Sequence, residues 1–553
     1  MNPENENNLD DPFLRTIKWL NPGDHSIQPV FDTIGRQVDV TNVIYDYTFN
    51  IDTLNYKQGF MPKKAFHDLP HDTTLTVVAW AERDNPDDNW DIYFRVVYWY
   101  TDISSQYVLA MTNPEQISNS ESADQTNPAV TAYLTQLMPM SVPSDGDPQN
   151  YFRYAADIYP NLVVDIAYQR SSPGHNMEVR YQQYLASMNE WNGIPGFGPF
   201  VPAPSGEFLL PTPFSGIDGD YKHPDIVFYS FPPGDEDNNA CNALFAAYEF
   251  ESITANPEND FYAIVAVAGP VDGGGIHWCD PCDPWIVSLE PKIPQQGYPS
   301  IWPQYPRIDA GVDSAVGYTI FGVAWHEWIT DVASTDIDSR LNIILIDMWF
   351  SGPPYTWLME GIHYDPAIYC AFPYIDIDPL EKYLVDDSDD QPPTPTGLPS
   401  YTNVVVTEGQ NPNNDTFKVG YWNSATGYVD VIYALYNRRS GFATISMYAL
   451  QSWEDDDYDF DVVFVSDHEV ENTYPVYSCK CWFDGSWTAI QKEPPSQISD
   501  DGHESSWDDF EEPLGFGPVG AIFDWRNEEV AWTYKASGPN YLHHVFGDYD
   551  FYW

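Results

Sequence analysis

A short apolar motif, two small or aliphatic residues followed by Trp or Tyr, recurs along this chain and limits the folds open to it. The motif is Val-Ala-Trp in three places and a close relative in three others, and its aromatic residues are Trp80, Tyr168, Tyr248, Trp325, Tyr433 and Trp532. A second strand-like stretch follows each motif, so the repeating unit is a β-hairpin. A hairpin repeated at intervals cannot bury both of its faces alone, so its copies must stack on one another. The sequence therefore predicts an all-β repeat protein.

Further strands are predicted on both sides of the hairpin. A proline that opens a short strand precedes most motifs, as at Asn127-Pro128, His223-Pro224, Tyr298-Pro299 and Pro399. Proline has no amide donor and is tolerated at the first position of a strand or at a sheet edge. Apolar stretches at 285–289 and 367–371 supply an outgoing strand. One strand in, a central hairpin and one strand out make up a propeller blade.

The pattern resembles the β-propeller superfamily, nearer to its sialidase-like and bacterial-repeat members than to WD40 proteins. The resemblance implies a β-propeller, which we expect to have six large four-stranded blades, with seven as the alternative. The ring would be closed by pairing a strand near residues 38–49 with the C-terminal strands, which removes exposed sheet edges. We expect residues 1–30 to form an N-terminal arm and residues 31–553 to form one propeller domain with long acidic loop insertions.

The charge of the chain is extreme for a folded protein. Asp and Glu number 83 against 23 Lys and Arg, a net charge of −60, while 43% of the residues are hydrophobic. In molar salt the Debye length falls to about 3 Å, which screens the self-repulsion of such a body. The composition therefore predicts a halophilic protein, with a calcium-rich acidic exoprotein as the alternative. A field of this sign repels phosphate, so we expect no binding to nucleic acid.

The N-terminal residues contain no basic segment followed by an apolar one, and no signal peptide is visible. No run of 18 apolar residues occurs, and we expect no membrane insertion. A large aromatic-rich β-protein of this kind is expected to be made in a high-salt cytoplasm and released on the surface of a virus particle. The source would be a halophilic archaeal virus.

Acidic loops and cysteines are candidate cation and redox sites. The loop at 454–461 carries hard oxygen ligands that suit Ca²⁺ or another cation, at Asp455, Asp457, Asp459 and Asp461. The alternative is an acidic surface solvated in salt. Cys279 and Cys282 are spaced for a local disulfide; a zinc site and reduced thiols are the alternatives.

No catalytic residue is predicted, and whether the chain is an enzyme stays open, with a non-enzyme favoured. Sialidase-like propellers use an arginine cluster, and an arginine follows several motifs here: Arg83, Arg170, Arg340 and Arg438. In a chain so poor in bases, pairing with nearby carboxylates is the simpler interpretation. The sequence contains no Gly-x-Ser-x-Gly elbow, no P-loop and no His-Glu-x-x-His motif.

The number of aromatic residues favours a protein that binds carbohydrate. The chain has 20 Trp, 39 Tyr and 29 Phe, and rings outside the core can stack on sugar faces. The candidate ligand-binding residues are Trp191, Trp278, Trp328 and Trp357, with packing between blades as the alternative role. We expect a virion surface protein (turret, spike or tail component) that binds host-cell glycans or the surface-layer glycoprotein. Its other partners would be virion proteins and further copies of itself.

Two other functions remain open. A propeller glycoside hydrolase or lyase requires, in the hydrolase case, two carboxylates about 5 to 9 Å apart. A cellular protein–protein scaffold requires an exposed apolar patch.

Overall fold

The computed structural model contains 36 strands, and no helix occurs among the residues that it describes. The described residues are these strands and short connections at 88–90, 112–114, 123, 172–177, 199–200, 203, 206–207, 210–218, 253–254, 260, 284, 292–293 and 299. Side chains are described for parts of the chain between residues 77 and 329 and for a few core positions beyond it.

The described strands form seven sheets, each named here by one of the two strands at the ends of its hydrogen-bonded order. The first three in chain order are the β5 sheet, with β5 (Lys63–Leu69), β6 (Thr73–Glu82), β7 (Asp91–Thr101), β8 (Tyr107–Met111), β2 (Val30–Phe31), β3 (Gln37–Val38) and β9 (Glu115–Ile117); the β10 sheet, with β10 (Asp124–Thr135), β11 (Asn161–Ser171), β12 (Glu178–Trp191), β13 (Ile194–Phe197), β14 (Val201–Pro202) and β15 (Phe208–Leu209); and the β16 sheet, with β16 (Gly219–Ser230), β17 (Asn242–Ser252), β18 (Phe261–Asp272), β19 (Gly275–Ile276) and β20 (Trp285–Pro291).

The remaining four are the β21 sheet, with β21 (Ser300–Asp313), β22 (Tyr318–Thr330), β23 (Ile337–Met348) and β24 (Tyr355–Trp357); the β25 sheet, with β25 (Tyr369–Ile377), β26 (Thr402–Gln410), β27 (Thr416–Asn423) and β28 (Gly427–Ala434); the β29 sheet, with β29 (Ser440–Met447), β30 (Phe460–Ser466), β31 (Val476–Phe483), β32 (Ile490–Lys492) and β33 (Ser496–Gln497); and the β34 sheet, with β34 (Val519–Asp524), β35 (Asn527–Lys535), β1 (Phe13–Trp19), β4 (Ile44–Asn50) and β36 (His543–Phe546). The described pairings are antiparallel except for the short pair β2–β8.

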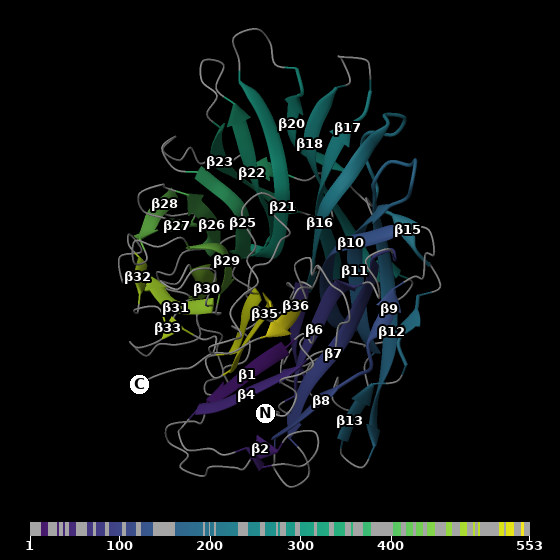
Figure 1. The fold of residues 1–553 in the computed structure, drawn as a ribbon, viewed down its shortest axis with the longest axis vertical. Coiled ribbons are helices and arrows are strands. Elements are labelled where there is room, and N and C mark those ends of the chain that lie inside the picture. Colours follow the sequence, from purple (N-terminus) through teal and green to yellow (C-terminus); the bar gives the residue numbers. More distant parts are fainter. Residues whose placement is uncertain are drawn as a thin grey trace.

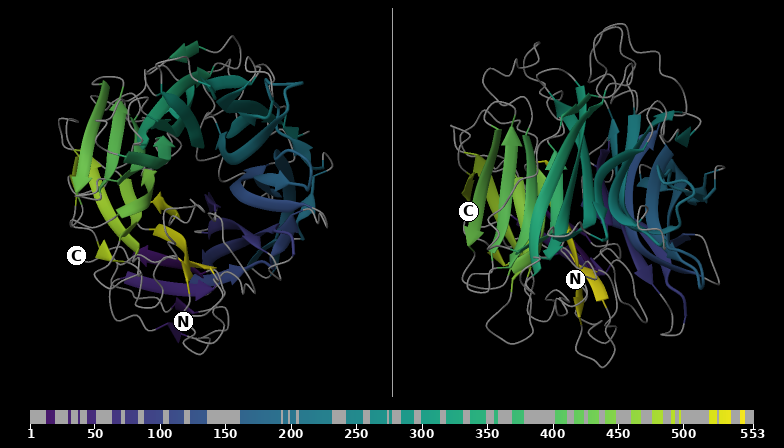
Figure 2. Two further views of the ribbon diagram at one scale, coloured as in Figure 1. Left: turned by 45° about the horizontal axis from the view of Figure 1, so that its top comes forward. Right: turned by 90° about the horizontal axis from the view of Figure 1, so that it is seen from above.

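The sheets follow one another in chain order around a common axis (Figures 1 and 2). The strands that give the sheets their names are called inner strands here. They pack against each other in sequence from β5 through β10, β16, β21, β25 and β29 to β34, and β34 packs against β5. This all-β arrangement of antiparallel sheets is consistent with the β-propeller expected from the sequence.

The two ends of the chain share the β34 sheet. β1 pairs with β35 over Phe13–Lys18, and β4 pairs with the other edge of β1. Residues 13–19, part of the segment expected to form an N-terminal arm, form a strand of this sheet. The segment expected to meet the C-terminal strands, 38–49, overlaps β4.

The structure describes seven sheets, whereas the sequence contains six copies of the motif. We call the strand that pairs with the inner strand of a sheet its second strand. Five of the motif aromatic residues lie in second strands: Trp80, Tyr168, Tyr248, Trp325 and Trp532. Tyr433 instead lies in β28, the fourth strand of its sheet. The second strands of the β25 and β29 sheets, β26 and β30, contain Val404–Val405–Val406 and Val462–Val463–Phe464, which lack the small residue and the Trp or Tyr. The motif search therefore counted one repeat where there are two, and it took residues 367–371, which overlap the inner strand β25, for an outgoing strand.

In β6, β11, β17 and β22 consecutive described residues are buried, so both faces of these strands are covered, which explains their nearly continuous apolar sequences. Between the β5 and β10 sheets the core contains Val77, Phe94, Ile166 and Tyr168. Between the β16 and β21 sheets it contains Phe245, Ala247, Phe321, Val323 and Trp325. Fully burying one large apolar side chain stabilises a protein by about 1.5–3 kcal/mol, so these sheet contacts are the main source of stability.

Four inner strands carry a β-bulge at an Xaa-Pro dipeptide. The register shifts enclose Asn127-Pro128, His223-Pro224, Tyr305-Pro306 and Phe372-Pro373. A bulge leaves a residue without a ladder hydrogen bond, which suits proline. The residue before proline has a positive φ in the first three: 50° at Asn127, 47° at His223 and 51° at Tyr305. The predicted strand-opening prolines Pro128 and Pro224 thus lie inside inner strands; Pro299 precedes β21, and Pro399 lies outside the described residues.

Candidate functional site

The residue after the motif aromatic is a buried polar residue in three consecutive sheets: Gln169, Glu249 and His326. In the first of these, Gln169 Oε1 accepts a hydrogen bond from Asn127 Nδ2 at 3.0 Å and one from the His223 amide at 3.4 Å. Asn127 belongs to the bulge of the same sheet and His223 to the bulge of the next. One side chain therefore ties two neighbouring inner strands together.

The β16 sheet repeats this tie with charged groups. Glu249 Oε1 lies 2.7 Å from His223 Nδ1, and it also accepts a hydrogen bond from the backbone amide of Tyr305 in the next bulge. Because a carboxylate only accepts hydrogen bonds, this contact places the hydrogen of the neutral imidazole on Nδ1.

In the β21 sheet the equivalent position is His326, which is fully buried. The His326 ring stacks on Tyr305 with centroids 5.3 Å apart, and Tyr305 lies 4.2 Å from the ring of His223. Burial, with smaller contributions from the electrostatic interactions with His223 and Arg307, lowers the pKa of His326 to about 3. His326 is therefore a neutral ring at neutral pH.

A buried carboxylate crosses the same interface. Asp225 follows the His223-Pro224 bulge and is 6% exposed. Its Oδ2 accepts a hydrogen bond from the Ile308 amide in β21 at 3.1 Å. The pairs His223–Tyr305 and Asp225–Ile308 occur in the same order along both strands, so β16 and β21 run in the same direction.

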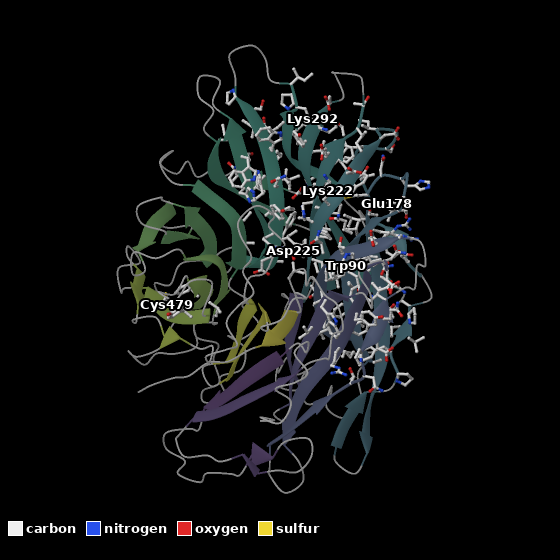
Figure 3. The ribbon with its side chains drawn as sticks, viewed as in Figure 1. Trp90, Glu178, Lys222, Asp225, Lys292 and Cys479 are labelled. Atoms are coloured by element: carbon white, nitrogen blue, oxygen red, sulfur yellow. The ribbon has the colours of Figure 1, made fainter. Side chains whose placement is uncertain are left out.

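Two lysines, Lys222 and Lys292, lie at the end where β16 starts (Figure 3), and they share one glutamate. Glu251 accepts hydrogen bonds from Lys222 Nζ at 2.7 Å and from Lys292 Nζ at 2.9 Å. Lys292 also lies 3.6 Å from Asp260 and 5.0 Å from the ring centroid of Tyr262. Burial lowers the pKa of Lys222, but the hydrogen bond and charge of Glu251 outweigh it and the net shift is upward. The shift of Glu251 is downward, because its bonds to both lysines outweigh the effect of burial on its pKa.

Partly exposed aromatic side chains lie beside this cluster. Trp302 and Trp328 are directly opposite each other on β21 and β22. Trp328 meets His326 edge to face, with ring centroids 5.3 Å apart. We call this surface the start face, because it lies where β16 and β21 start; it consists of Lys222, Glu251, Tyr262, Lys292, Trp302, Tyr305 and Trp328.

A second polar cluster is buried between the β10 and β16 sheets. Asp165 is fully buried, and its Oδ1 accepts hydrogen bonds from the Tyr181 hydroxyl and from Gln183 Nε2, the latter at 3.0 Å. Its Oδ2 has no hydrogen-bond partner among the described atoms. Burial raises the pKa of Asp165 to about 7 against the opposing effect of these hydrogen bonds. Tyr133, which also reaches Gln183, stacks on Phe228 of the next sheet at 3.7 Å.

Only one of the four predicted ligand-binding tryptophans, Trp328, has a described side chain. Trp191 ends β12 and Trp357 ends the outermost strand β24, while Trp278 lies outside the described residues. Cys279 and Cys282 also lie outside them, as do Asp455, Asp457 and Asp459. Asp461 lies in β30, opposite Lys480. Among the described residues no group of three His, Cys, Asp or Glu side chains could hold a metal ion.

Of the arginines considered at sequence level, Arg170 is described and pairs with a carboxylate. Its Nη1 lies 3.4 Å from both carboxylate oxygens of Glu207. The distances agree with the simpler interpretation, pairing with a nearby acid.

Sequence reasoning missed His223, Glu249 and Tyr305. Their signal was present in two places: an Xaa-Pro dipeptide inside a predicted inner strand, and the residue directly after the motif aromatic. The motif was interpreted as ending on the aromatic ring, so the polar position beside it was not followed from sheet to sheet.

Comparison with known proteins identifies no family for this chain. No family model matches the sequence, and no similar curated protein is found. A solved structure with a similar course of the chain is an alpha-L-arabinanase from Penicillium chrysogenum in complex with arabinobiose. It is 12% identical, the match covers 74% of this chain and 90% of the arabinanase, and the TM-score is 0.31. Likeness at this level assigns neither an activity nor a ligand to this chain.

Within the described part of the chain, no helix is long and apolar enough to span a membrane.

Proposed function

We propose that this protein is a non-enzymatic, seven-bladed β-propeller that binds the glycans of a cell surface in concentrated salt. Each sheet is one blade, and the β34 sheet closes the ring by joining strands from both ends of the chain. The ligand lies across the start face, over the adjoining ends of the β16 and β21 sheets.

The observation that carries this proposal is the mixture of side chains on the start face. Trp302, Trp328 and Tyr305 are partly exposed aromatic residues, and Lys222 and Lys292 are paired bases on the same ends of the strands. Rings of this kind pack against the C–H faces of sugars, and charged side chains exchange hydrogen bonds with hydroxyl groups.

The carboxylates near this face favour binding over hydrolysis. Glycoside hydrolases need one carboxyl group as acid and another as nucleophile or base. Asp225 and Glu249 are both buried and accept hydrogen bonds from backbone amides of the neighbouring sheet. These two groups hold sheets together, and the more exposed Glu251 is bonded to Lys222 and Lys292, which keeps it ionised and does not suit a general acid.

The setting that we propose is the surface of a virus particle in a halophilic environment. The net charge of −60 on a chain with 43% hydrophobic residues supports the high-salt part of this proposal. Mass spectrometry of purified particles would detect the protein there, and its absence from them would contradict a virion role.

Glycan binding is tested with full-length protein, in molar KCl, on surface-layer glycoprotein purified from halophilic cells. We expect Trp302→Ala and Trp328→Ala each to weaken binding by about tenfold or more, because each removes a stacking surface worth more than about 1 kcal/mol.

The matched control is Tyr93→Ala, which removes a partly exposed aromatic residue stacked on Trp80 in the β5 sheet, away from the start face. Equal loss of binding in the control, or none in the tryptophan variants, would contradict a ligand site on this face.

A further inference from the structure

His223 occupies a backbone conformation that is uncommon for its residue type. Its φ of 47° lies in the left-handed region, and proline follows it. Non-glycine residues in this region cost about 1–3 kcal/mol and are frequent at ligand-binding positions. Asn127 has the same conformation in the β10 sheet, so the bulge itself is a repeated structural element. The side chain placed on it is what differs between the two sheets.

The contact with Glu249 fixes the orientation of the His223 imidazole. Nδ1 donates to the buried carboxylate at 2.7 Å, and the carboxylate is held by the amide of Tyr305. An imidazole whose Nδ1–H is bound to a carboxylate presents the lone pair of Nε2 on its other side. The His223 side chain is 20% exposed, and within the described part of the chain no group hydrogen-bonds its Nε2.

The surroundings of His223 are those of a ligand contact. The ring lies 4.2 Å from Tyr305, and Lys222 of the start face directly precedes it in the chain. The equivalent residue of the β10 sheet, Asn127, makes the same tie with a neutral amide. Holding the sheets together therefore does not require an imidazole at this position.

We propose that Nε2 of His223 accepts a hydrogen bond from a hydroxyl group of the bound ligand, which makes His223 a specificity-determining residue for a saccharide. This inference rests on the proposed glycan-binding function and assigns a contact within the same site. The sugar lies with one hydroxyl directed at Nε2 and with a C–H face against the ring of Tyr305.

The β10 sheet supplies the design of the test. The double variant His223→Asn/Glu249→Gln gives the β16 sheet the same Asn–Gln tie that Asn127 and Gln169 make in the β10 sheet. Its fold is therefore expected to persist, with a thermal midpoint close to that of the original protein. Affinity for the surface-layer glycoprotein is expected to fall by about tenfold or more, since one directed hydrogen bond to a ligand is worth roughly 1–1.5 kcal/mol. The control is again Tyr93→Ala, which lies in the β5 sheet away from the start face and is expected to leave the affinity unchanged.

A second measurement separates ligand contact from structural support. In full-length protein labelled with ¹⁵N at histidine, the His223 signals are identified by their loss in the double variant. Addition of glycans released from the same glycoprotein is expected to shift the Nε2 signal of His223 and to leave its Nδ1 hydrogen in place. A folded double variant that binds as well as the original protein, or an Nε2 signal that does not move on binding, would overturn the inference and leave the proposed function standing. Failure of the original protein to bind would overturn both.

Discussion

Each of the two interfaces of the β16 sheet buries one titratable side chain, an acid on one side and a base on the other. On the side of the β10 sheet a carboxyl group, Asp165, is fully buried with one oxygen unpaired, and burial raises its pKa to about 7. On the side of the β21 sheet an imidazole, His326, is fully buried, and burial lowers its pKa to about 3. Each interior favours the neutral form of its group. The comparison shows that each contact stabilises the uncharged form of one titratable group, while the second contact also contains the buried carboxylates Asp225 and Glu249.

The interfaces differ in what they connect. The Asp165 cluster consists of buried Tyr133, Tyr181 and Gln183 and ends within the core. The polar chain on the other side begins at buried Glu249 and His326 and passes through His223 and Tyr305 to the partly exposed start face. We therefore interpret the first as support for the fold and the second as support for a site.

The largest expected effect concerns His326. The pKa of this imidazole is 6.5 in the unfolded chain and about 3 in the folded protein, so between these pH values only the unfolded chain is protonated at His326. Stability from this group is therefore complete above about pH 6.5 and falls as the pH drops toward 3, by up to about 5 kcal/mol. His326→Gln, which copies Gln169 at the equivalent position, is expected to remove this dependence. Denaturant unfolding midpoints at constant molar salt, measured from pH 3 to 7, test it; an unchanged slope in the variant would contradict a buried neutral imidazole.

A slightly smaller effect of opposite sign is expected for Asp165. The unfolded chain loses the proton of this residue near pH 3.8, whereas the folded protein keeps it until about pH 7. The folded state therefore loses stability as the pH rises from about 4 to 7, by up to about 4 kcal/mol. Asp165→Asn should abolish this loss and leave a protein that becomes more stable as the pH rises. The same unfolding series measures it, and a variant whose stability still falls over this range would contradict the assignment.

The double variant His326→Gln/Asp165→Asn gives the smallest change and serves as the control for both. The two side chains lie in different interfaces and share no hydrogen-bond partner among the described contacts, so their effects should add. Its pH dependence should resemble that of the original protein, in which the two opposing slopes largely cancel between about pH 4 and 6.5. A slope that matches either single variant would show that the two interfaces are coupled.

Much of the fold could be predicted from the sequence because its strongest signal is local. Five of the six motifs lie in second strands, since an aliphatic–alanine–aromatic triplet suits a strand that is buried on both faces. The repeat missed in the β25 and β29 sheets followed from the same logic. β26 contains Val404–Val406 in place of the triplet, and β30 fills buried positions with Val462–Phe464, so a search for one triplet could not find them.

The candidate site could be predicted only in part. Trp328, one of the four tryptophans chosen from the sequence, lies on the start face, and its role in ligand binding stays a prediction. His223, Glu249 and Tyr305 come from two sheets, and they meet only because β16 and β21 lie side by side. Strand order and bulge register are not visible in the sequence alone. Asp165 was missed for a related reason, because one Asp among 83 acidic residues gives no sign that it is buried.

The most direct test of the central claim is binding of the full-length protein to surface-layer glycoprotein in molar KCl, before and after the glycans are chemically removed. We predict saturable binding that is lost with the glycans and weakened by Trp302→Ala and Trp328→Ala. Equal binding to the intact and the deglycosylated glycoprotein, or binding to neither, would contradict a glycan-binding start face.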